Sequence, residues 1–155
     1  MLPGLFGGAG MILLGIDPGV SGAFAVLDTV ENRVTTHDMP DTTAALHSLV
    51  MSLPPVRICI LEKPYYPKII GTANVARIAE AFGKIVSALT WRDIPTEQVA
   101  PAKWKAALNL NSNKAASREM ASQLFPEDAA QWARVRDDGR AEAALLAWFA
   151  KGRAR

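Results

Sequence analysis

Short apolar runs separated by turn residues dominate the first forty residues of the chain. The runs at 11–17, 23–28 and 33–39 are each bounded by Gly, Pro, Asp or Asn, which is typical of short strands. Residues 42–53 then repeat apolar side chains with helical spacing, and we expect Asp41 to cap this helix. The pattern therefore predicts three strands in a meander, followed by a helix.

Strand and helix alternate in the rest of the chain. Residues 56–62 read as a buried strand, residues 73–91 as a long amphipathic helix with Thr72 as its expected cap, and residues 95–100 contain a short strand. Short connections between such elements predict an α/β domain, a five-stranded mixed sheet with helices on both faces. The remaining expected helices are 101–109, 113–125, which stops at Pro126, and a final helix that starts near Asp138.

Length and composition fit one folded domain. The chain has 155 residues, of which half are hydrophobic and about a fifth are charged, so a sizeable core can form and disorder is not expected. We expect residues 11–155 to be a single domain and residues 1–10 to be a disordered extension. A start codon assigned too far upstream is the alternative for that extension. Its glycines and proline argue against a membrane span, so no membrane partner is expected.

The chain contains a single cysteine, Cys59, in an apolar run. Neither an intramolecular disulfide nor a cysteine-rich zinc site can form, which fits a reducing cytoplasm. We expect Cys59 to pack as a small hydrophobic residue. The isolated His37 and His47 are given no metal role. The tryptophans are expected to pack, and they are Trp91, Trp104, Trp132 and Trp148.

Acidic residues end two of the expected strands. Asp17 closes the first strand and Glu62 closes the strand at 56–62. If these strands are neighbours, both carboxylates lie at one edge of the sheet, where α/β proteins commonly place their sites. A turn-forming Asp before Pro and Gly is the alternative for Asp17. Glu62 is harder to explain this way, because Glu is depleted in strands.

A second pair of acids lies on the final helix. Asp138 and Glu142 are four residues apart and so share a helical face. Glu142 also shares a face with Leu145, Leu146 and Phe149, and a carboxylate on an apolar face needs a positive partner. The alternative is structural: Asp138 caps the helix and Glu142 supports its N-terminus through the dipole.

Four converging carboxylates cannot all stay ionised without cations. Hard oxygen ligands of this kind suit Mg²⁺, or Mn²⁺ in its place. Two such ions about 4 Å apart activate a water and stabilise the leaving oxygen of a phosphodiester. Asp17, Glu62, Asp138 and Glu142 together therefore suggest a two-metal nuclease centre.

Four segments in order resemble a known family. They are GIDPGVSGAFAVLD, ILEKPYYPK, VAPAKWKAALNLNSNKAASREMASQLFP and DDGRAEAALLA. Together they resemble the RuvC-like Holliday junction resolvases of the RNase H-like superfamily, over nearly all of the chain after residue 10. GIDPG alone also occurs in actin-like ATPases, so the specificity of the match lies in the four motifs together.

The resemblance implies an RNase H-like fold and a homodimeric, Mg²⁺-dependent endonuclease that cuts two opposed strands of a four-way DNA junction symmetrically. The family's first and second acids fall on Asp17 and Glu62. The bacterial housekeeping enzymes place Asp or His three residues before a final Asp, whereas here Asp138 lies four before Glu142, a D-G-x-A-E form similar to the phage and chloroplast branches. Asp137 remains a competitor of Asp138.

A resolvase must also hold DNA phosphates near its acids. Lys114 stands out because a cation in the first turn of a helix opposes the helix dipole, and Lys105 and Lys114 fall near the family's DNA-contacting lysines. A solvated charged face is the alternative for each basic residue. The candidate DNA-binding cations are Lys63, Lys103, Lys105, Lys114, Arg118, Arg136 and Arg140.

Tyr65 lies three residues after Glu62, where the family has an aromatic side chain that stacks on a base in the junction centre. Stacking contributes about 1–3 kcal/mol per base. An ordinary loop tyrosine is the alternative, and Tyr66 could replace Tyr65. We expect the long helix from Ala73 to Trp91 to form the dimer interface, because its apolar positions outnumber those that one sheet face needs.

Three other functions compete with junction resolution. An RNase H-like nuclease for flaps or forks would use the same residues, and a catalytically silent junction-binding protein would keep the fold. A fragment of an actin-like ATPase ranks last, because the chain is too short for two lobes.

Overall fold

The three predicted N-terminal strands form an antiparallel meander in the computed structural model, which describes residues 10–154. β1 (Ile12–Asp17), β2 (Ala23–Asp28) and β3 (Arg33–Asp38) are joined by short turns. Of the expected N-terminal extension, only Gly10 lies within the described residues.

Two parallel strands complete the sheet on the other side of β1. β4 (Ile58–Glu62) pairs with β1, and β5 (Thr96–Val99) pairs with β4. The strand order is β3-β2-β1-β4-β5, so β1 and β4 occupy the interior of the sheet. The predicted five-stranded mixed sheet is confirmed.

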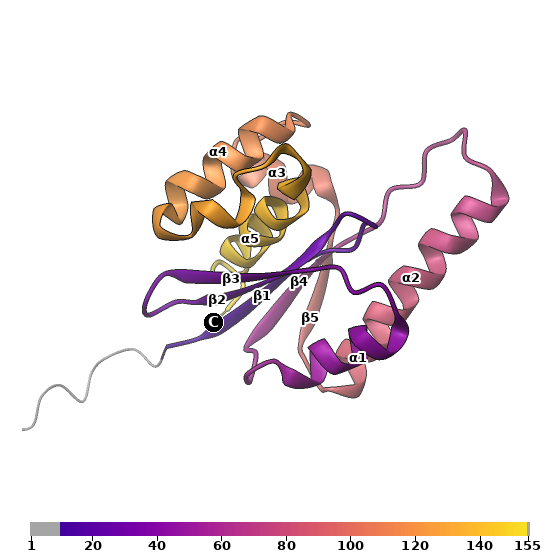
Figure 1. Cartoon of the computed structure of the whole chain (residues 1–155), viewed down its shortest axis with the longest axis horizontal. Coiled ribbons are helices and arrows are strands. Elements are labelled where there is room, and N and C mark those ends of the chain that lie inside the picture. The colour runs from indigo at the N-terminus through magenta and orange to yellow at the C-terminus, as the bar shows by residue number, and fades with distance from the viewer. Residues whose placement is uncertain (1–9, 155) are drawn as a thin grey trace, which may run out of the picture.

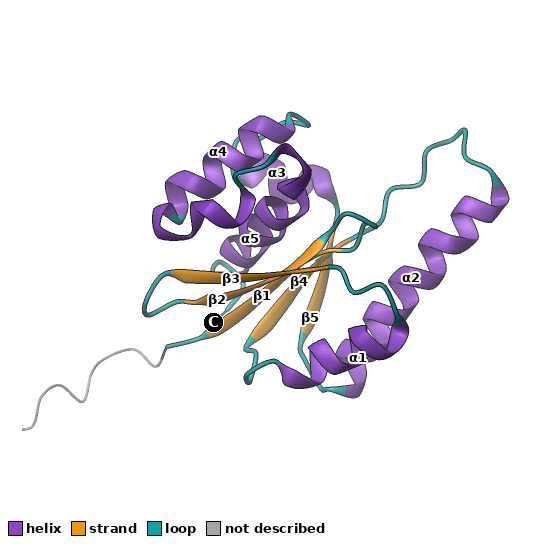
Figure 2. Cartoon of the chain, in the orientation of Figure 1, coloured by secondary structure: helices purple, strands orange, loops and turns teal. Residues whose placement is uncertain are grey.

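Helices cover both faces of the sheet, as the sequence predicts (Figures 1 and 2). The helices α1 and α2 pack on one face and α3, α4 and α5 on the other, each group over its own apolar core. Two short 3-10 segments, η1 and η2, connect α4 to α5. The bounds are α1 (Thr43–Ser52), α2 (Thr72–Trp91), α3 (Pro101–Ala107), α4 (Lys114–Leu124), η1 (Pro126–Trp132), η2 (Val135–Asp137) and α5 (Asp138–Ala150).

The cores confirm most of the expected packing residues. Cys59 is fully buried, and burial raises the pKa of its thiol. Trp104 and Trp132 are buried as well, and Trp148 packs edge-on against Phe125. The prediction for Trp91 was wrong: it is the last residue of α2 and is 76% exposed.

Both expected helix caps are replaced by their neighbours. Thr42, not Asp41, caps α1, and its Oγ1 accepts a hydrogen bond from the backbone N–H of Ala45. Gly71 precedes α2 without a side-chain cap, and Thr72 is the first helical residue. Asp, Thr and Gly all suit a cap position, so the sequence alone did not separate adjacent candidates.

Two glycines let α5 lie directly on the sheet. A Cβ on Gly15 of β1 would lie 2.1 Å from the carbonyl oxygen of Ala143, and one on Gly139 would lie 2.1 Å from that of Ser21. Any larger residue would push the helix away from β1. This close approach buries ten of the thirteen residues of α5, among them Glu142, and so brings Glu142 to the edge of the sheet where β1 ends.

Among residues 10–154, no helix is long and apolar enough to cross a membrane.

Candidate active site

Asp17 and Glu62 end two neighbouring parallel strands, as the sequence analysis supposed. Ile16 of β1 is in register with Leu61 of β4, so the acids that follow them lie at the same edge of the sheet. Side chains alternate between faces along a strand. Ile60 packs in the core beneath α5, so Glu62, two residues on, lies on the face that carries α5, and Asp17 shares that face by the same alternation from Gly15.

Glu142 reaches this edge from α5, and two lysines neutralise it. It is only 2% exposed. Its Oε1 lies 3.1 Å from Nζ of Lys105 in α3, and its Oε2 lies 2.8 Å from Nζ of Lys114 in α4. Glu142 therefore has its positive partners within the chain. They are Lys105 and Lys114, which the sequence had suggested as DNA contacts.

The two competing aspartates before Glu142 have different arginine partners. Asp137 is buried, and both of its carboxylate oxygens accept from Arg134, at 2.7 and 2.9 Å. Asp138 is paired with Arg118 of α4, the helix that also carries the Lys114 partner of Glu142. Position thus favours Asp138 over Asp137 as the acid beside Glu142, and its role as a ligand stays a prediction.

The acids at the strand ends hold protons more tightly than usual. Burial raises the pKa of Glu62 to about 7, and the charges of Asp17 and Glu142 add to the effect. Burial also raises the pKa of Asp17, although a hydrogen bond from the backbone of Gly19 lowers it. These carboxylates therefore lack enough positive charge nearby, which is the environment a divalent cation would relieve.

Burial lowers the pKa of Lys114, but the hydrogen bond and charge of Glu142 outweigh this effect and raise it overall. The side chain of Lys114 is therefore protonated and positively charged at neutral pH. A cation in the first turn of α4, unfavourable toward the helix dipole, is explained by its contact with Glu142.

Trp104 is a site residue that the sequence did not reveal. Its indole Nε1 donates a 2.6 Å hydrogen bond to Oε2 of Glu62. The side chain is fully buried, so it fixes the carboxylate against the core. A tryptophan in a helical pattern signals packing, and nothing in the sequence pattern points to a polar partner 42 residues earlier.

The donor set suits Mg²⁺, but its present arrangement is not a preformed metal site. Among residues 10–154, no group of three or more His, Cys, Asp or Glu side chains is placed to hold a metal ion. Lys105 and Lys114 contact the oxygens of Glu142. Within residues 10–154, no lysine or arginine forms an ion pair with Asp17 or Glu62. Carboxylate oxygens with raised pKa values are hard ligands for Mg²⁺ or Mn²⁺, so the chemistry fits once Glu142 is released.

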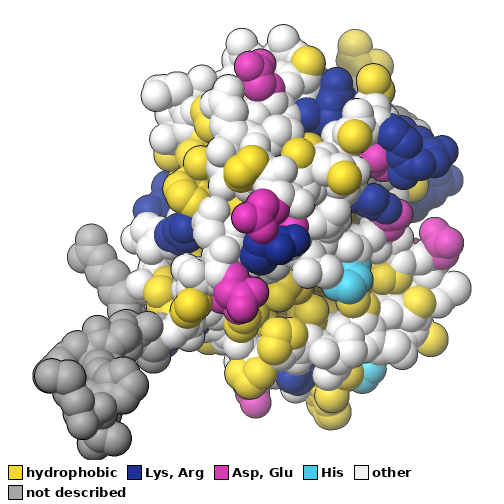
Figure 3. Space-filling view, turned by 60° about the vertical axis from the view of Figure 1, so that its left-hand side comes forward, with side chains coloured by type: hydrophobic (Ala, Val, Ile, Leu, Met, Phe, Trp, Pro, Cys, Tyr) yellow, Lys and Arg dark blue, Asp and Glu magenta, His cyan; other side chains and the backbone are white. Residues whose placement is uncertain are grey.

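Two of the other predicted DNA-binding cations pair with acids outside the candidate site. Nζ of Lys103 faces Glu97 at 3.7 Å. Arg140 makes two 2.7 Å contacts with Asp38 and therefore fixes β3 to α5. Lys63, next to Glu62, and Arg136, in η2, are exposed, as is Lys103. Figure 3 shows the largest group of Lys and Arg side chains at its upper right, with others spread over the rest of that face.

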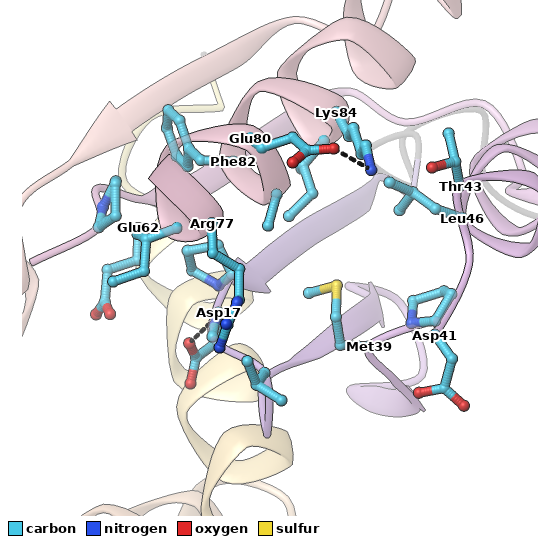
Figure 4. A pocket seen from close by; sticks show the side chains of 18 of the residues that line it. Asp17, Met39, Asp41, Thr43, Leu46, Glu62, Arg77, Glu80, Phe82 and Lys84 are labelled. Carbon is cyan, nitrogen blue, oxygen red and sulfur yellow. Dashed lines mark hydrogen bonds and ion pairs between the residues drawn. The ribbon is translucent and has the colours of Figure 1, made fainter. Parts of the chain in front are cut away.

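A cleft of about 570 Å³ begins at Asp17 and Glu62 and continues between α1 and α2. Figure 4 shows both acids near one end and Arg77 extending from α2 towards Asp17. Tyr65, which is 74% exposed, also lines the cleft. Arg77 is a second residue that the sequence did not single out, because an exposed arginine in an amphipathic helix reads as a solvated position.

The fold matches solved structures of RuvC. A Thermus thermophilus RuvC in complex with a Holliday junction substrate aligns with a TM-score of 0.61 and 15% identity, over 92% of this chain and 96% of that chain. A second Thermus thermophilus RuvC structure aligns with a TM-score of 0.62 and 16% identity, over 93% and 98%. The predicted α/β fold is confirmed, and it is the fold of these RuvC structures.

The yeast mitochondrial Holliday junction resolvase Ydc2 aligns with 17% identity over 86% of this chain and 75% of that chain, and its TM-score of 0.47 is too low to bear on the fold. No protein-family model matches the chain, and no curated protein matches its sequence.

Proposed function

We propose that the protein is a structure-selective endonuclease that resolves four-way DNA junctions by metal-dependent hydrolysis of phosphodiester bonds. The observation that carries the proposal is the meeting of three acids at one edge of a RuvC-like sheet. Asp17 and Glu62 end adjacent parallel strands, and Glu142 is buried on the helix that covers them. One similar structure is a RuvC bound to a Holliday junction substrate, which supports the choice of DNA.

Asp17, Glu62, Glu142 and Asp138 would hold the metal, as two Mg²⁺ ions in each site with Mn²⁺ as a substitute. Bound there, the ions would activate water and neutralise the leaving oxygen. Trp104 orients the Glu62 carboxylate through its hydrogen bond. Lys105 and Lys114 lie beside the same acids, where they can contact the phosphate that is cut.

Symmetric cutting of two opposed strands requires two sites related by a two-fold axis, so the active form is a homodimer. The first half of α2 supports this form. Among the described residues of α2, only Ile85, Ala88 and Leu89 are buried, all in its second half. Figure 1 shows the first half, with the loop before it, extending from the body of the molecule. This half of α2 is the proposed dimer surface, and the exposed Tyr65 before it is the residue proposed to stack on a junction base.

Junction selectivity is tested with one set of labelled substrates that share sequence: a four-way junction, a flap, a fork and a linear duplex. We expect Mg²⁺-dependent cutting of the junction at paired positions in opposed strands, with none in a chelator. Equal cutting of flaps or forks would point to a branched-DNA nuclease instead. Tight junction binding without any cutting would point to a silent binding protein.

A cytoplasmic location belongs to the same proposal, since Cys59 forms no disulfide.

A further inference from the structure

Two acids of the candidate site, Glu142 and Asp138, are paired with cations of the chain itself. Glu142 contacts Lys105 and Lys114, and Asp138 contacts Arg118. Lysines reach Glu142 from two different helices, α3 and α4, and the side chain of Lys105 is only 15% exposed. Lys114 is half exposed, but it contacts the same buried carboxylate. Contacts made to a buried charge from two separate helices are not the chance pairs of a solvated surface.

These contacts occupy the oxygens that a metal would need. Both oxygens of Glu142 accept from a lysine, and an ammonium group and a divalent cation repel each other at such short range. Binding of a divalent ion to Glu142 therefore favours the departure of at least one lysine. If the lysines left without a replacement, the buried charge of Glu142 would be unpaired, which is strongly unfavourable.

We propose that Lys105 and Lys114 are exchangeable counter-ions of Glu142, a proposal that rests on the proposed function. They hold the carboxylate in place in the metal-free protein, and they move away when a divalent ion binds. Side chains released from Glu142 remain at the edge of the sheet, where the substrate phosphate must arrive. The same two residues thus act as positioning residues before metal binding and as phosphate contacts after it.

A footprint of lysine reactivity tests the exchange on the unaltered protein. Acetylation of each lysine is measured by mass spectrometry, with and without saturating Mg²⁺ and without DNA. We expect the labelling rates of Lys105 and Lys114 to rise severalfold with Mg²⁺. Lys103 is the matched control, because it lies on α3 beside Lys105 but faces Glu97, and its rate should not change. Equal rates at Lys105 and Lys114 with and without bound Mg²⁺ would overturn the proposal.

Metal affinity provides the second test. Lys105→Met and Lys114→Met each remove one competitor of the ion, so Mn²⁺ measured by calorimetry without DNA should bind about tenfold more tightly to either variant, a coupling within the usual range. Lys103→Met should bind Mn²⁺ as the unaltered protein does. Unchanged or weaker binding by both variants would refute the exchange. Junction cleavage that needs Mg²⁺, together with unchanged affinities, would reject only this proposal, whereas absence of any metal binding would reject the proposed function too.

Discussion

The indole Nε1 of Trp104 donates a 2.6 Å hydrogen bond to Oε2 of Glu62, which connects the end of β4 to helix α3. Partners of this kind orient metal-binding carboxylates, and their removal typically lowers activity or metal affinity about 10–100-fold. Trp104→Phe keeps most of the buried ring but loses the donor. We expect single-turnover cleavage of a four-way junction to fall by about this factor, while junction binding is kept.

Trp132→Phe is the matched control for this change. Trp132 is equally buried, and its Nε1 donates to Ser122 at 3.0 Å, away from the acids. Both variants should lose similar stability through the smaller ring. If Trp132→Phe slows cleavage as much as Trp104→Phe does, the effect comes from packing and the role assigned to Trp104 is wrong.

The fold could be predicted from the sequence because its strands and helices follow simple periods. Alternating apolar and polar residues, together with short apolar runs, predicted all five strands. Asp17 and Glu62 were expected at one edge of the sheet if their strands were neighbours. The pairing of β1 with β4 meets that condition. The caps were missed because Asp41 and Thr72 each stand beside a competitor that suits the same position.

The contacts of the site could not be predicted in the same way. Glu142 contacts Lys105 and Lys114, which lie 37 and 28 residues before it in the chain. The periodicity of helices and strands does not predict contacts over such separations. Trp91 was expected to pack because it is large and apolar, yet its side chain lies on the solvent side of the last turn of α2. Arg77 was overlooked since only the three-dimensional structure places it in the cleft beside Asp17.

The stability of the metal-free protein should depend on the ionisation of Glu62. Its pKa is raised to about 7 in the folded protein by burial first, against an ordinary value of 4.5. Protonation of Glu62 therefore stabilises the folded state. This contribution to the free energy of unfolding is fully present below pH 4.5 and is lost as the pH rises through about 7. Glu62→Gln mimics the protonated acid, so it should be more stable than the unaltered protein at pH 8, by ~1–2 kcal/mol.

Urea unfolding in the presence of a chelator measures this difference at pH 4.5 and at pH 8. The advantage of Glu62→Gln should shrink towards zero at the lower pH, where Glu62 is protonated in the folded protein. An advantage that is equal at both pH values would show that Glu62 carries no raised pKa.

Helix α5 should depend on the absence of a side chain at Gly15. A Cβ there would lie 2.1 Å from the carbonyl oxygen of Ala143, so Gly15→Ala must displace α5 and with it Glu142. We expect a loss of ~2–4 kcal/mol in the free energy of unfolding, together with loss of cleavage. Gly83→Ala is the control: a Cβ on this glycine of α2 meets nothing within 4 Å, and it should stabilise the helix by ~0.5–1 kcal/mol. Equal stability of the two variants would contradict the close packing of α5 on β1.

Asp137 and Asp138 should differ in what their loss affects. Asp137 is buried and bound by Arg134, which holds its pKa below the usual range, so Asp137→Asn should cost ~1–3 kcal/mol of stability and leave cleavage measurable. Asp138→Asn should abolish cleavage with a smaller effect on stability. Thermal unfolding and junction cleavage of the two variants decide the assignment. A folded Asp137→Asn that cannot cut, beside an active Asp138→Asn, would reverse it.

The proposed function requires the acids at this sheet edge to cut DNA junctions rather than only bind them. The most direct measurement compares the unaltered protein with Asp17→Asn on a four-way junction labelled in two opposed strands, recording binding and nicking in parallel with Mg²⁺. We predict paired nicks at symmetric positions for the unaltered protein, and undiminished binding without nicks for Asp17→Asn. Nicking by Asp17→Asn at the rate of the unaltered protein would contradict the account.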